Sequence, residues 1–523
     1  MFWADKIVND IREKLADEKN AKSALVIRDE KTASGPVHVG AMRGAALHGI
    51  LSYILRNEGY ENTYLYEIND FDAFDTVPHG VDESFAEHLG KPLFAVPSPD
   101  GNGNYAEHYG NAFARVIQAA GFEPHVYYSS GEYKAGKYND VIKTALTRAT
   151  DINRINKEVS GSEKDAAYLP LMVICEGCGK VATTRAVKFN GETVHYVCDQ
   201  EGSGALGCGH EGNVSPYDGN AKLPWKVEWA AKFKVFDVDI EGEGKDLATK
   251  GGARDVANHI CREVFKWKPP YDAPYEFLLV DGKKMSTSKG NAATAVAVSA
   301  LMPSKIFRTL LLGRDVRRAI NFDPSGDTIP LLFDQYDRVA QKYWEGADDD
   351  DARLFSLIHE DDEPEAFFLP RFSQIAYLVQ MTHLSLEDEV AAMKGAPLTE
   401  AEKKELEERA GYAQRWLREY APDDFKFELQ KDAVPSGAQT LSPGMKTAIG
   451  KILRYIEVHE DLDGQELHSA LHDIRKESGV EPAVFFSAIY QSFLGTDSGP
   501  KAGWFLSVLP REFLIERLEE VSK

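Results

Sequence analysis

The spacing of apolar residues changes along this chain. Residues 23–28 and 63–70 are short apolar runs typical of strands, while residues 40–60 between them repeat apolar side chains at helical spacing and end near Gly59. A strand, a glycine-containing loop, a helix and a second strand in this order form a βαβ unit. The pattern therefore predicts a parallel sheet of the kind that binds nucleotides.

Helical and strand patterns alternate as far as the segment INFDPSGDTIP, after which the strand signal fades. We expect an α/β domain over residues 1–330 and an all-α domain over residues 331–523, whose helices break at Pro and Gly. Between about residues 168 and 220 the composition shifts toward Cys, Gly and β-branched side chains. That shift predicts a small β-rich insertion in the α/β domain.

Charge and hydropathy narrow the class of protein. The chain has 523 residues and a formal net charge of -23, and its N-terminal segment carries both charge signs, unlike a signal or transit peptide. No apolar run approaches the length of a membrane helix. We therefore expect a cytoplasmic protein with no membrane partner. The acidity argues against indiscriminate nucleic-acid binding but leaves room for a local basic surface.

Four of the five cysteines lie close together in the predicted insertion. Their spacing is C-x2-C, 19 residues, then C-x9-C, and a glycine follows the second cysteine of each pair. Four thiolates at such spacing are typical of a structural zinc site with no open position. The sequence predicts Zn²⁺ bound by Cys175, Cys178, Cys198 and Cys208. His210 is an alternative to Cys208 as the fourth ligand.

The segment TASGPVHVG, residues 32–40, joins the first predicted strand to the helix that follows; we call it the His38 segment. Its small residues Ser34, Gly35 and Gly40 let backbone N–H groups approach a ligand, and a helix N-terminus favours phosphate. His38 is placed to donate to that phosphate. A tight strand-to-helix turn with a capping Ser and an exposed His fits the same letters.

A second candidate follows the apolar run YEFLLV. The segment DGKKMSTSKGN, residues 281–291 and here called the basic loop, combines ammonium donors and hydroxyls in the manner of a phosphate clamp. A solvated basic turn is the alternative. Its candidate phosphate ligands are Lys283, Lys284, Ser286, Thr287, Ser288 and Lys289.

The two segments together resemble the HIGH and KMSKS signatures of the class I aminoacyl-tRNA synthetases. The stretches TASGPVHVGAMRG, LPWKVEWAAKF and GKDLATKGGARDVANHI are similar to the class I lysyl-tRNA synthetase family in particular, and the likeness covers roughly residues 20 to 330. It implies a Rossmann-type catalytic domain that forms lysyl-adenylate from ATP and L-lysine, with Mg²⁺ on the phosphates, and a helical domain that binds the anticodon of tRNA(Lys). The oligomeric state is open, with a monomer favoured.

The resemblance also assigns roles to individual residues. The catalytic set it implies is His38, Lys284, Ser286, Ser288 and Lys289. ATP binding is assigned to Ser34, Gly35, Gly40, Asp246, Gly251 and Gly252, and lysine binding to Thr32, Trp225 and Tyr275. Asp70 and Asp72 lie at the carboxyl end of a predicted strand, where α/β sheets bind ligands, and either supply charge for the lysine side chain or cap a helix.

Three residues depart from the family pattern. Ala41 stands where relatives have His or Asn, Leu247 where many have His, and Glu30 where some have Gly. Glu30 either meets a substrate ammonium or faces solvent from a loop. The rival hypotheses are a synthetase of another amino-acid specificity and a tRNA-binding paralogue without activity. A basic patch of Arg308, Arg314, Arg317 and Arg318 is either a tRNA contact or ordinary helix-surface charge.

Overall fold

A computed structural model describes residues 1–16, 24–280, 293–360, 362, 364–381, 384–459 and 462–523. The chain divides into two compact units, the first being Met1–Asp323 with Arg338–Glu365 and the second Pro324–Asp337 with Ala366–Lys523. Helix α11 (Thr328–Trp344) begins in the second unit and ends in the first. Among the described helices, none is long and apolar enough to cross a bilayer.

A parallel sheet forms the centre of the first unit. Strand β2 (Asn62–Asn69) lies between β1 (Leu25–Thr32) and β3 (His125–Tyr128). On its other edge β1 is extended by single parallel bridges, from Ile27 to Ile240 and from Ile240 to Tyr271. The predicted βαβ unit is confirmed.

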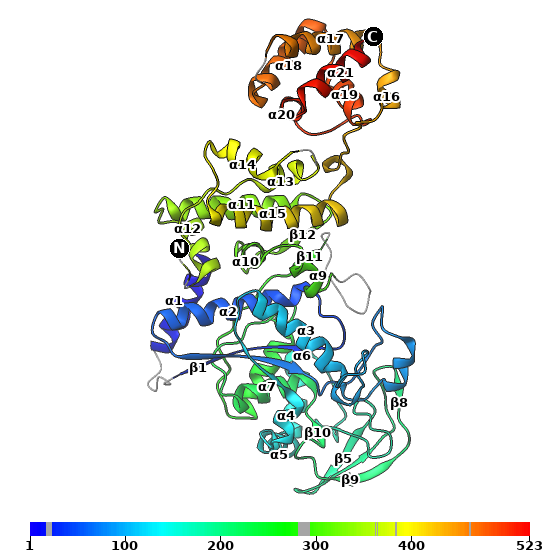
Figure 1. The fold of residues 1–523 in the computed structure, drawn as a ribbon. Coiled ribbons are helices and arrows are strands. Elements are labelled where there is room, and N and C mark those ends of the chain that lie inside the picture. The colour runs from blue at the N-terminus through cyan, green and yellow to red at the C-terminus, as the bar shows by residue number, and fades with distance from the viewer. Residues whose placement is uncertain (17–23, 281–292, 361, 363, 382–383, 460–461) are drawn as a thin grey trace. The chain divides into compact units, whose positions relative to one another are not determined.

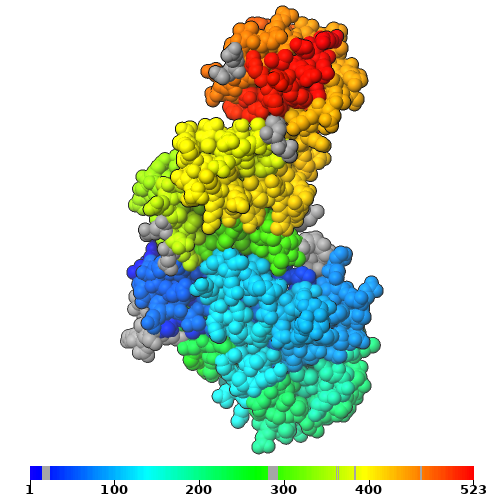
Figure 2. All heavy atoms as spheres, in the orientation of Figure 1, coloured from blue at the N-terminus to red at the C-terminus, as the bar shows by residue number. Residues whose placement is uncertain are grey.

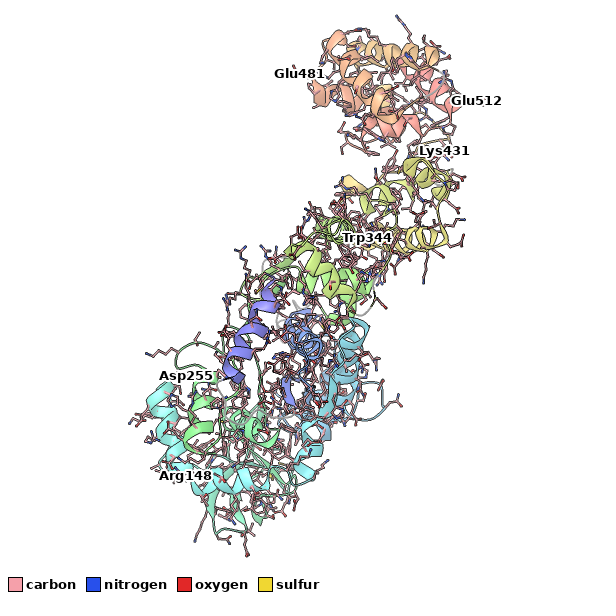
Figure 3. The ribbon with its side chains drawn as sticks, turned by 90° about the vertical axis from the view of Figure 1, so that its left-hand side faces the viewer. Arg148, Asp255, Trp344, Lys431, Glu481 and Glu512 are labelled. Carbon is pink, nitrogen blue, oxygen red and sulfur yellow. The ribbon has the colours of Figure 1, made fainter. Side chains whose placement is uncertain are left out.

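Helices cover both faces of this sheet. Helix α2 (Met42–Asn57) packs on β1 and β2, and α7 (Trp225–Val235), which packs on α8 (Ala253–Glu263), lies on the opposite side of β1 in Figure 1. Figure 3 shows α6 (Ala149–Ser160) beside α8, near Arg148 and Asp255. The other helices of this unit are α1 (Trp3–Ala16), α3 (Tyr105–Ala119), α4 (Ser129–Lys134), α5 (Asn139–Thr147), α9 (Ala295–Ser299), α10 (Ser304–Leu312) and α12 (Asp350–His359).

Local sequence explains where these helices begin. Asn104 accepts from the N–H of Glu107 and Glu107 accepts from the N–H of Asn104, a capping box that starts α3. α2 approaches its neighbours closely because it carries glycine, and a Cβ on Gly49 would lie 2.5 Å from the ring of Phe122. Short 3-10 turns occur at η1 (Val39–Ala41), η2 (Glu83–His88) and η3 (Leu93–Ala95).

Short strands fill the region that was predicted to be β-rich. β5 (Arg185–Phe189), β6 (Val194–Val197) and β9 (Glu211–Val214) form an antiparallel sheet with β6 in the middle. Two further pairs are antiparallel, β4 (Met172–Val173) with β10 (Ala221–Lys222) and β7 (Glu201–Gly202) with β8 (Ala205–Leu206). Further along, β11 (Leu278–Val280) pairs in parallel with β12 (Ile320–Phe322).

The second unit is helical, as predicted for the C-terminal part. Apolar side chains of its last helices form one core, and the orange and red residues of these helices pack into one continuous body in Figure 2. Its elements are α13 (Phe372–Leu378), α14 (Leu386–Lys394), α15 (Glu400–Glu419), η5 (Asp423–Phe425), α16 (Ser436–Gln439), α17 (Pro443–Val458), α18 (Gly464–Ser478), α19 (Pro482–Phe493), α20 (Ala502–Ser507) and α21 (Arg511–Ser522).

Candidate active site

The carboxyl ends of β1 and β2 open toward the loop that leads into α2. β1 ends at Thr32, the His38 segment follows at once, and Gly35 adopts φ 156°, a conformation that favours glycine. Ligands of open parallel sheets bind outside this edge, next to the first helix that leaves it. The first predicted phosphate-binding segment is therefore at the expected edge.

The His38 segment pairs with residues that directly follow the basic loop. The N–H of Val39 donates to the carbonyl of Ala293 (2.9 Å), the N–H of Ala295 donates to that of Val37 (2.8 Å), and His38 and Thr294 form an antiparallel bridge. The basic loop itself, with Lys284, Ser286, Ser288 and Lys289, lies outside the described residues. Its C-terminal flank is thus fixed beside the His38 segment, although the two are far apart in sequence.

Charged side chains fill the face of the sheet toward α7. Arg28 is fully buried and donates to the hydroxyl of Tyr127 (2.9 Å), to Glu241 (2.9 Å) and to Glu67 (2.6 Å), and it also pairs with Glu30. Glu241 in turn accepts from the indole N–H of Trp229 (2.5 Å). A buried arginine with this many acceptors is compensated rather than isolated.

Two lysines extend this arrangement toward the edge of the sheet. Lys232 lies 2.6 Å from Glu30 and 2.7 Å from Glu67, and Lys222 lies 3.2 Å from Glu228 and pairs with Asp72. Asp72 also accepts from the hydroxyl of Thr32 (2.7 Å). We call the set the charge network; its members are Arg28, Lys222, Lys232, Glu30, Glu67, Asp72, Glu228 and Glu241.

Two carboxylates of the charge network reach solvent. The side chains of Glu30 and Asp72 are 21% and 26% exposed, whereas Glu67, Glu228 and Glu241 are 0–3% exposed. Burial raises the pKa of Glu30, but the ammonium of Lys232 and the guanidinium of Arg28 outweigh it and lower the pKa to about 2. Burial likewise opposes the effect of Lys222 on Asp72, whose pKa is lowered. Both carboxylates are therefore ionised at neutral pH.

The four clustered cysteines converge in the β-rich region. Their sulfur atoms all lie within 4.8 Å of one another, with 3.6 Å between Cys175 and Cys208 and 3.8 Å between Cys178 and Cys198. A tetrahedral metal bound at about 2.3 Å from each sulfur sets them about 3.8 Å apart. The cluster therefore fits a four-thiolate metal site. His210 lies outside the cluster, and its Nε2 is 3.9 Å from a Glu176 oxygen.

Thiol acidity differs strongly within the cluster. A hydrogen bond from the backbone of His210 lowers the pKa of Cys208 to about 7, whereas burial raises the pKa of Cys178 to about 12. A bound cation offsets the cost of burying thiolates. The donor set and its spacing suit a soft divalent metal.

Comparison with known proteins gives the family. Residues 1–361 match the family model described as tRNA synthetases class I (K). The chain belongs to this family. A protein of Methanosarcina barkeri named Lysine--tRNA ligase is 33% identical over 100% of this chain and 98% of its own length, and one of Thermoplasma volcanium with the same name is 32% identical over 100% and 99%. A solved glutamate tRNA ligase from Elizabethkingia meningosepticum covers 95% of this chain and 99% of its own at TM-score 0.40 and 12% identity.

The lysine-binding residues assigned from the class I synthetase resemblance lie in different surroundings. Thr32 is hydrogen-bonded to Asp72, while Trp225 is 43% exposed at the start of α7 and stacks on Trp229 at 6.1 Å. Tyr275 belongs to the opposite face of the sheet. Its hydroxyl would lie 2.7 Å from a Cβ placed on Gly44 of α2.

Asp70 is engaged by the start of α4. Its carboxylate accepts from the N–H of Ser130 (2.7 Å) and from the hydroxyls of Ser130 (2.6 Å) and Ser129 (2.9 Å). Burial raises the pKa of Asp70 more than these hydrogen bonds lower it. This arrangement matches the capping alternative that the sequence left open.

The residues assigned to adenosine lie at the entry of α8. Gly252 is its N-cap, and Gly251 adopts φ 75° and donates to Asp255 (2.9 Å). A Cβ on Gly251 would lie 2.9 Å from the carbonyl of Val159. Asp246 lies just before this entry, with a carboxylate oxygen 2.9 Å from the position of a Cβ on Gly244. These glycines therefore have a packing role whether or not a nucleotide binds.

The prediction that Arg308 belongs to a basic surface patch is wrong. Arg308 is 3% exposed and donates to the carbonyls of Ala120 (2.9 Å) and Leu357 (2.7 Å) and to Glu360, because it anchors α10 inside the first unit. It is not a surface residue. Arg314, Arg317 and Arg318 are exposed and remain available to a partner.

The sequence reasoning missed most of the charge network. The available signals were Arg28 two residues before Glu30 in a strand that begins with the apolar run Leu25–Ile27, and Glu228 four residues before Lys232 in a helix rich in aromatic and alanine residues. Residues two apart share a strand face and residues four apart share a helix face. Charges on the buried side of both elements predict a polar contact between them.

Proposed function

We propose that this protein ligates L-lysine to tRNA(Lys), using ATP to form a lysyl-adenylate intermediate. The observation that carries the proposal is the pairing of the His38 segment with residues 293–295, because these residues directly follow the basic loop in sequence and lie beside the His38 segment at the carboxyl edge of the sheet. The names of the full-length relatives support lysine as the amino acid. In the described residues, no observation favours another specificity.

In this proposal ATP lies at the carboxyl edge of the sheet. His38 and backbone groups near Ser34, Gly35 and Gly40 bind one side of the triphosphate, and Lys284, Ser286, Ser288 and Lys289 bind it from the basic loop. Asp246, Gly251 and Gly252 are assigned to the nucleoside. Mg²⁺ neutralises the phosphates when bound. Adenylyl transfer needs positioning and charge stabilisation more than covalent help, which suits this residue set.

The amino acid is assigned to the end of β1 nearest the charge network. Thr32 and Trp225 supply a hydroxyl and an aromatic wall there, whereas Tyr275, which the family resemblance also assigns to lysine, lies on the opposite face of the sheet. Asp70 contributes by fixing Ser129 and Ser130 at the start of α4. The departures at Ala41 and Leu247 remove two polar groups found in relatives, but both lie on the nucleotide side of the proposal.

The cysteine cluster is proposed to hold one structural Zn²⁺. Cys175, Cys178, Cys198 and Cys208 supply four sulfurs, which leaves no position for catalysis. Elemental analysis should give about one zinc per chain for a four-thiolate site, and Cys178→Ser should lose it with a lower melting temperature. Undiminished zinc in that variant would contradict the assignment.

The units are proposed to divide the work. We assign the catalytic domain to residues 1–330 and the anticodon-binding domain to residues 331–523, a division that differs from the two compact units, since residues 338–365 pack with the first unit and residues 324–330 with the second. Arg314, Arg317 and Arg318 are candidate tRNA phosphate contacts. The protein is proposed to act in the cytoplasm, and a monomer is favoured.

Amino-acid-dependent ATP–pyrophosphate exchange tests the proposed chemistry. Lysine should support exchange, and the other nineteen amino acids of the standard set of twenty should support far less. A response to another amino acid alone would establish the first rival. A response to none, with tRNA still bound, would establish the inactive paralogue.

The basic loop is tested by lysine substitution. Lys284→Ala or Lys289→Ala should lower the exchange rate constant roughly 100-fold or more while the KM for lysine changes little, because the loop is assigned to the phosphates and not to the amino acid. Equal effects on both parameters would remove these lysines from the catalytic set.

A further inference from the structure

The charge network contains more carboxylates than cations. It contains five carboxylates and three cations, a surplus of two negative charges on a face of the sheet that is largely buried. Asp29 and Lys31, which alternate onto the opposite face of β1, add one charge of each sign and leave the surplus unchanged. Unbalanced buried charge is costly, so a cationic ligand that reaches this network is favoured.

Access restricts the place where a cation can enter. Glu67, Glu228 and Glu241 are closed off by β2, α7 and their own partners, whereas Glu30 and Asp72 are 21% and 26% exposed. Both lie near the carboxyl edge of the sheet, which is the side assigned to substrates. A ligand ammonium arriving from this edge meets one of these two carboxylates first.

Glu30 and Asp72 differ in how many of their carboxylate oxygens already accept a hydrogen bond. Asp72 accepts through both oxygens, from Lys222 at Oδ1 and from Thr32 at Oδ2. Glu30 accepts from Arg28 and Lys232 through the same oxygen, Oε2. Within the part of the chain that the structure describes, no donor is hydrogen-bonded to Glu30 Oε1. An ionised carboxylate oxygen at a solvent-accessible edge is an open acceptor for an ammonium.

The places of Glu30 and Thr32 on β1 also suit Glu30 as an acceptor for a ligand ammonium. Glu30 and Thr32 are two residues apart on β1 and therefore share the face toward α7, roughly 7 Å apart along the strand. In the sheet Glu30 is paired with Glu67 and Thr32 with Asn69. A substrate whose α-amino end lies near Thr32 can extend its four methylenes along this face to Glu30.

We infer that Glu30 is the specificity-determining acceptor of the lysine ε-ammonium, through Oε1, and that Asp72 is a positioning residue that holds Thr32. The inference rests on the proposed function, because it names the side-chain recognition within that site. Lys232 and Arg28 keep Glu30 ionised and fixed without consuming its second oxygen. The same carboxylate rejects neutral side chains of equal length, since they leave the surplus charge uncompensated.

The test compares lysine with a neutral analogue of the same length, 2-amino-6-hydroxyhexanoic acid. In Glu30→Gln the KM for lysine in ATP–pyrophosphate exchange should rise roughly 10- to 100-fold, since a hydrogen bond between charged groups is lost. The inhibition constant of the analogue should change less than about threefold, because it has no ammonium to lose. Glu30→Asp keeps the charge on a shorter side chain, so its KM for lysine should lie between those of wild type and Glu30→Gln.

Glu67→Gln is the matched control, since Glu67 shares Arg28 and Lys232 with Glu30 and is fully buried. It should lower the melting temperature at least as much as Glu30→Gln but leave the ratio of lysine to analogue affinity near the wild-type value. Equal weakening of both ligands in Glu30→Gln, or the same ratio change in Glu67→Gln, would overturn the inference and leave the function intact. Absence of lysine-dependent exchange in the wild type would overturn the proposed function and this inference together.

Discussion

Each unit buries an arginine among carboxylates, but the two arrangements differ in what they leave open. In the second unit Arg409 donates to both oxygens of Asp337 (2.5 and 2.9 Å), to Glu405 (2.7 Å) and to the carbonyl of Pro370 (2.9 Å). Asp337 is 20% exposed, so exposure alone does not separate it from Glu30. Its two oxygens are nevertheless both satisfied by one guanidinium.

The first unit distributes its charges differently. Arg28 and Lys232 converge on one oxygen of Glu30, and the set as a whole carries two surplus negative charges. The Arg409 cluster links α11 to α15, and this structural role is sufficient to explain it. Buried ion pairs are thus weak signs of function by themselves. An accessible acceptor at the ligand-binding edge of a sheet is a stronger one.

Removing Arg28 should have the largest effect. Arg28→Met leaves Glu67 and Glu241 buried without their guanidinium and should cost roughly 3–5 kcal/mol of unfolding free energy. It should also abolish lysine-dependent exchange, because Glu30 loses the group that fixes it. Denaturant unfolding and exchange on the same sample measure both. A stable, active variant would show that the charge network supports neither fold nor site.

Removing Arg409 should affect stability without comparable loss of chemistry. Arg409→Met leaves Asp337 and Glu405 unpaired and should also cost about 3–5 kcal/mol, confined to the transition of the helical unit. Pyrophosphate exchange under folding conditions should stay within about threefold of wild type, since the residues proposed for adenylation belong to the first unit or to the basic loop. Loss of exchange in a folded Arg409→Met variant would contradict the idea that the Arg409 cluster serves stability alone.

Thr32 offers a smaller and more local change. Thr32→Val removes the hydroxyl that donates to Asp72 and should raise the KM for lysine roughly 10-fold with little change in kcat, because one hydrogen bond to a charged group is worth about 1.5–3 kcal/mol. Thr32→Ser keeps the hydroxyl and serves as the control. A loss in Thr32→Ser with none in Thr32→Val would mean that the methyl group matters and the hydroxyl does not.

Lowering the pH should change the stability contributed by Glu30 and by Asp337 in opposite directions. The folded-state pKa of Glu30 is about 2, below its ordinary 4.5, so its stabilisation is complete above pH 4.5 and is lost as the pH falls toward 2. Burial raises the pKa of Asp337, so the folded protein takes up that proton more readily and gains stability as the pH falls through the raised value.

Denaturation midpoints between about pH 3 and pH 6 measure this difference. On acidification the stability advantage of wild type over Glu30→Gln should shrink, while its stability relative to Asp337→Asn should increase. Parallel trends in the two comparisons would show that the clusters do not differ in this respect.

The sequence predicted the architecture because local periodicity determines it. The βαβ unit, the β-rich insertion and the helical C-terminal part follow from spacing and composition, and the cysteine cluster follows from its motif. The charge network was not predictable in the same way. Its members come from β1, β2 and the residues after it, β10, α7 and the segment around Glu241, and only the tertiary fold brings them together.

Single residues were harder still. Glu30 fitted an exposed loop as well as a substrate contact until β1 proved to continue through Thr32. From sequence alone Asp70 fits charge recognition as well as capping, because the contacts of Ser129 and Ser130 with its carboxylate depend on how β2 and α4 pack. Arg308 fitted a surface patch because helix periodicity does not say which neighbour covers a face.

Transfer of lysine to tRNA is the most direct test of the account. The full-length protein should be incubated with ATP, Mg²⁺, labelled lysine and total tRNA, and the RNA-bound label measured. ATP-dependent, base-labile lysine is expected on tRNA, carried by the species that decode lysine. Attachment of a different amino acid, or adenylate formation without any transfer to tRNA, would contradict it.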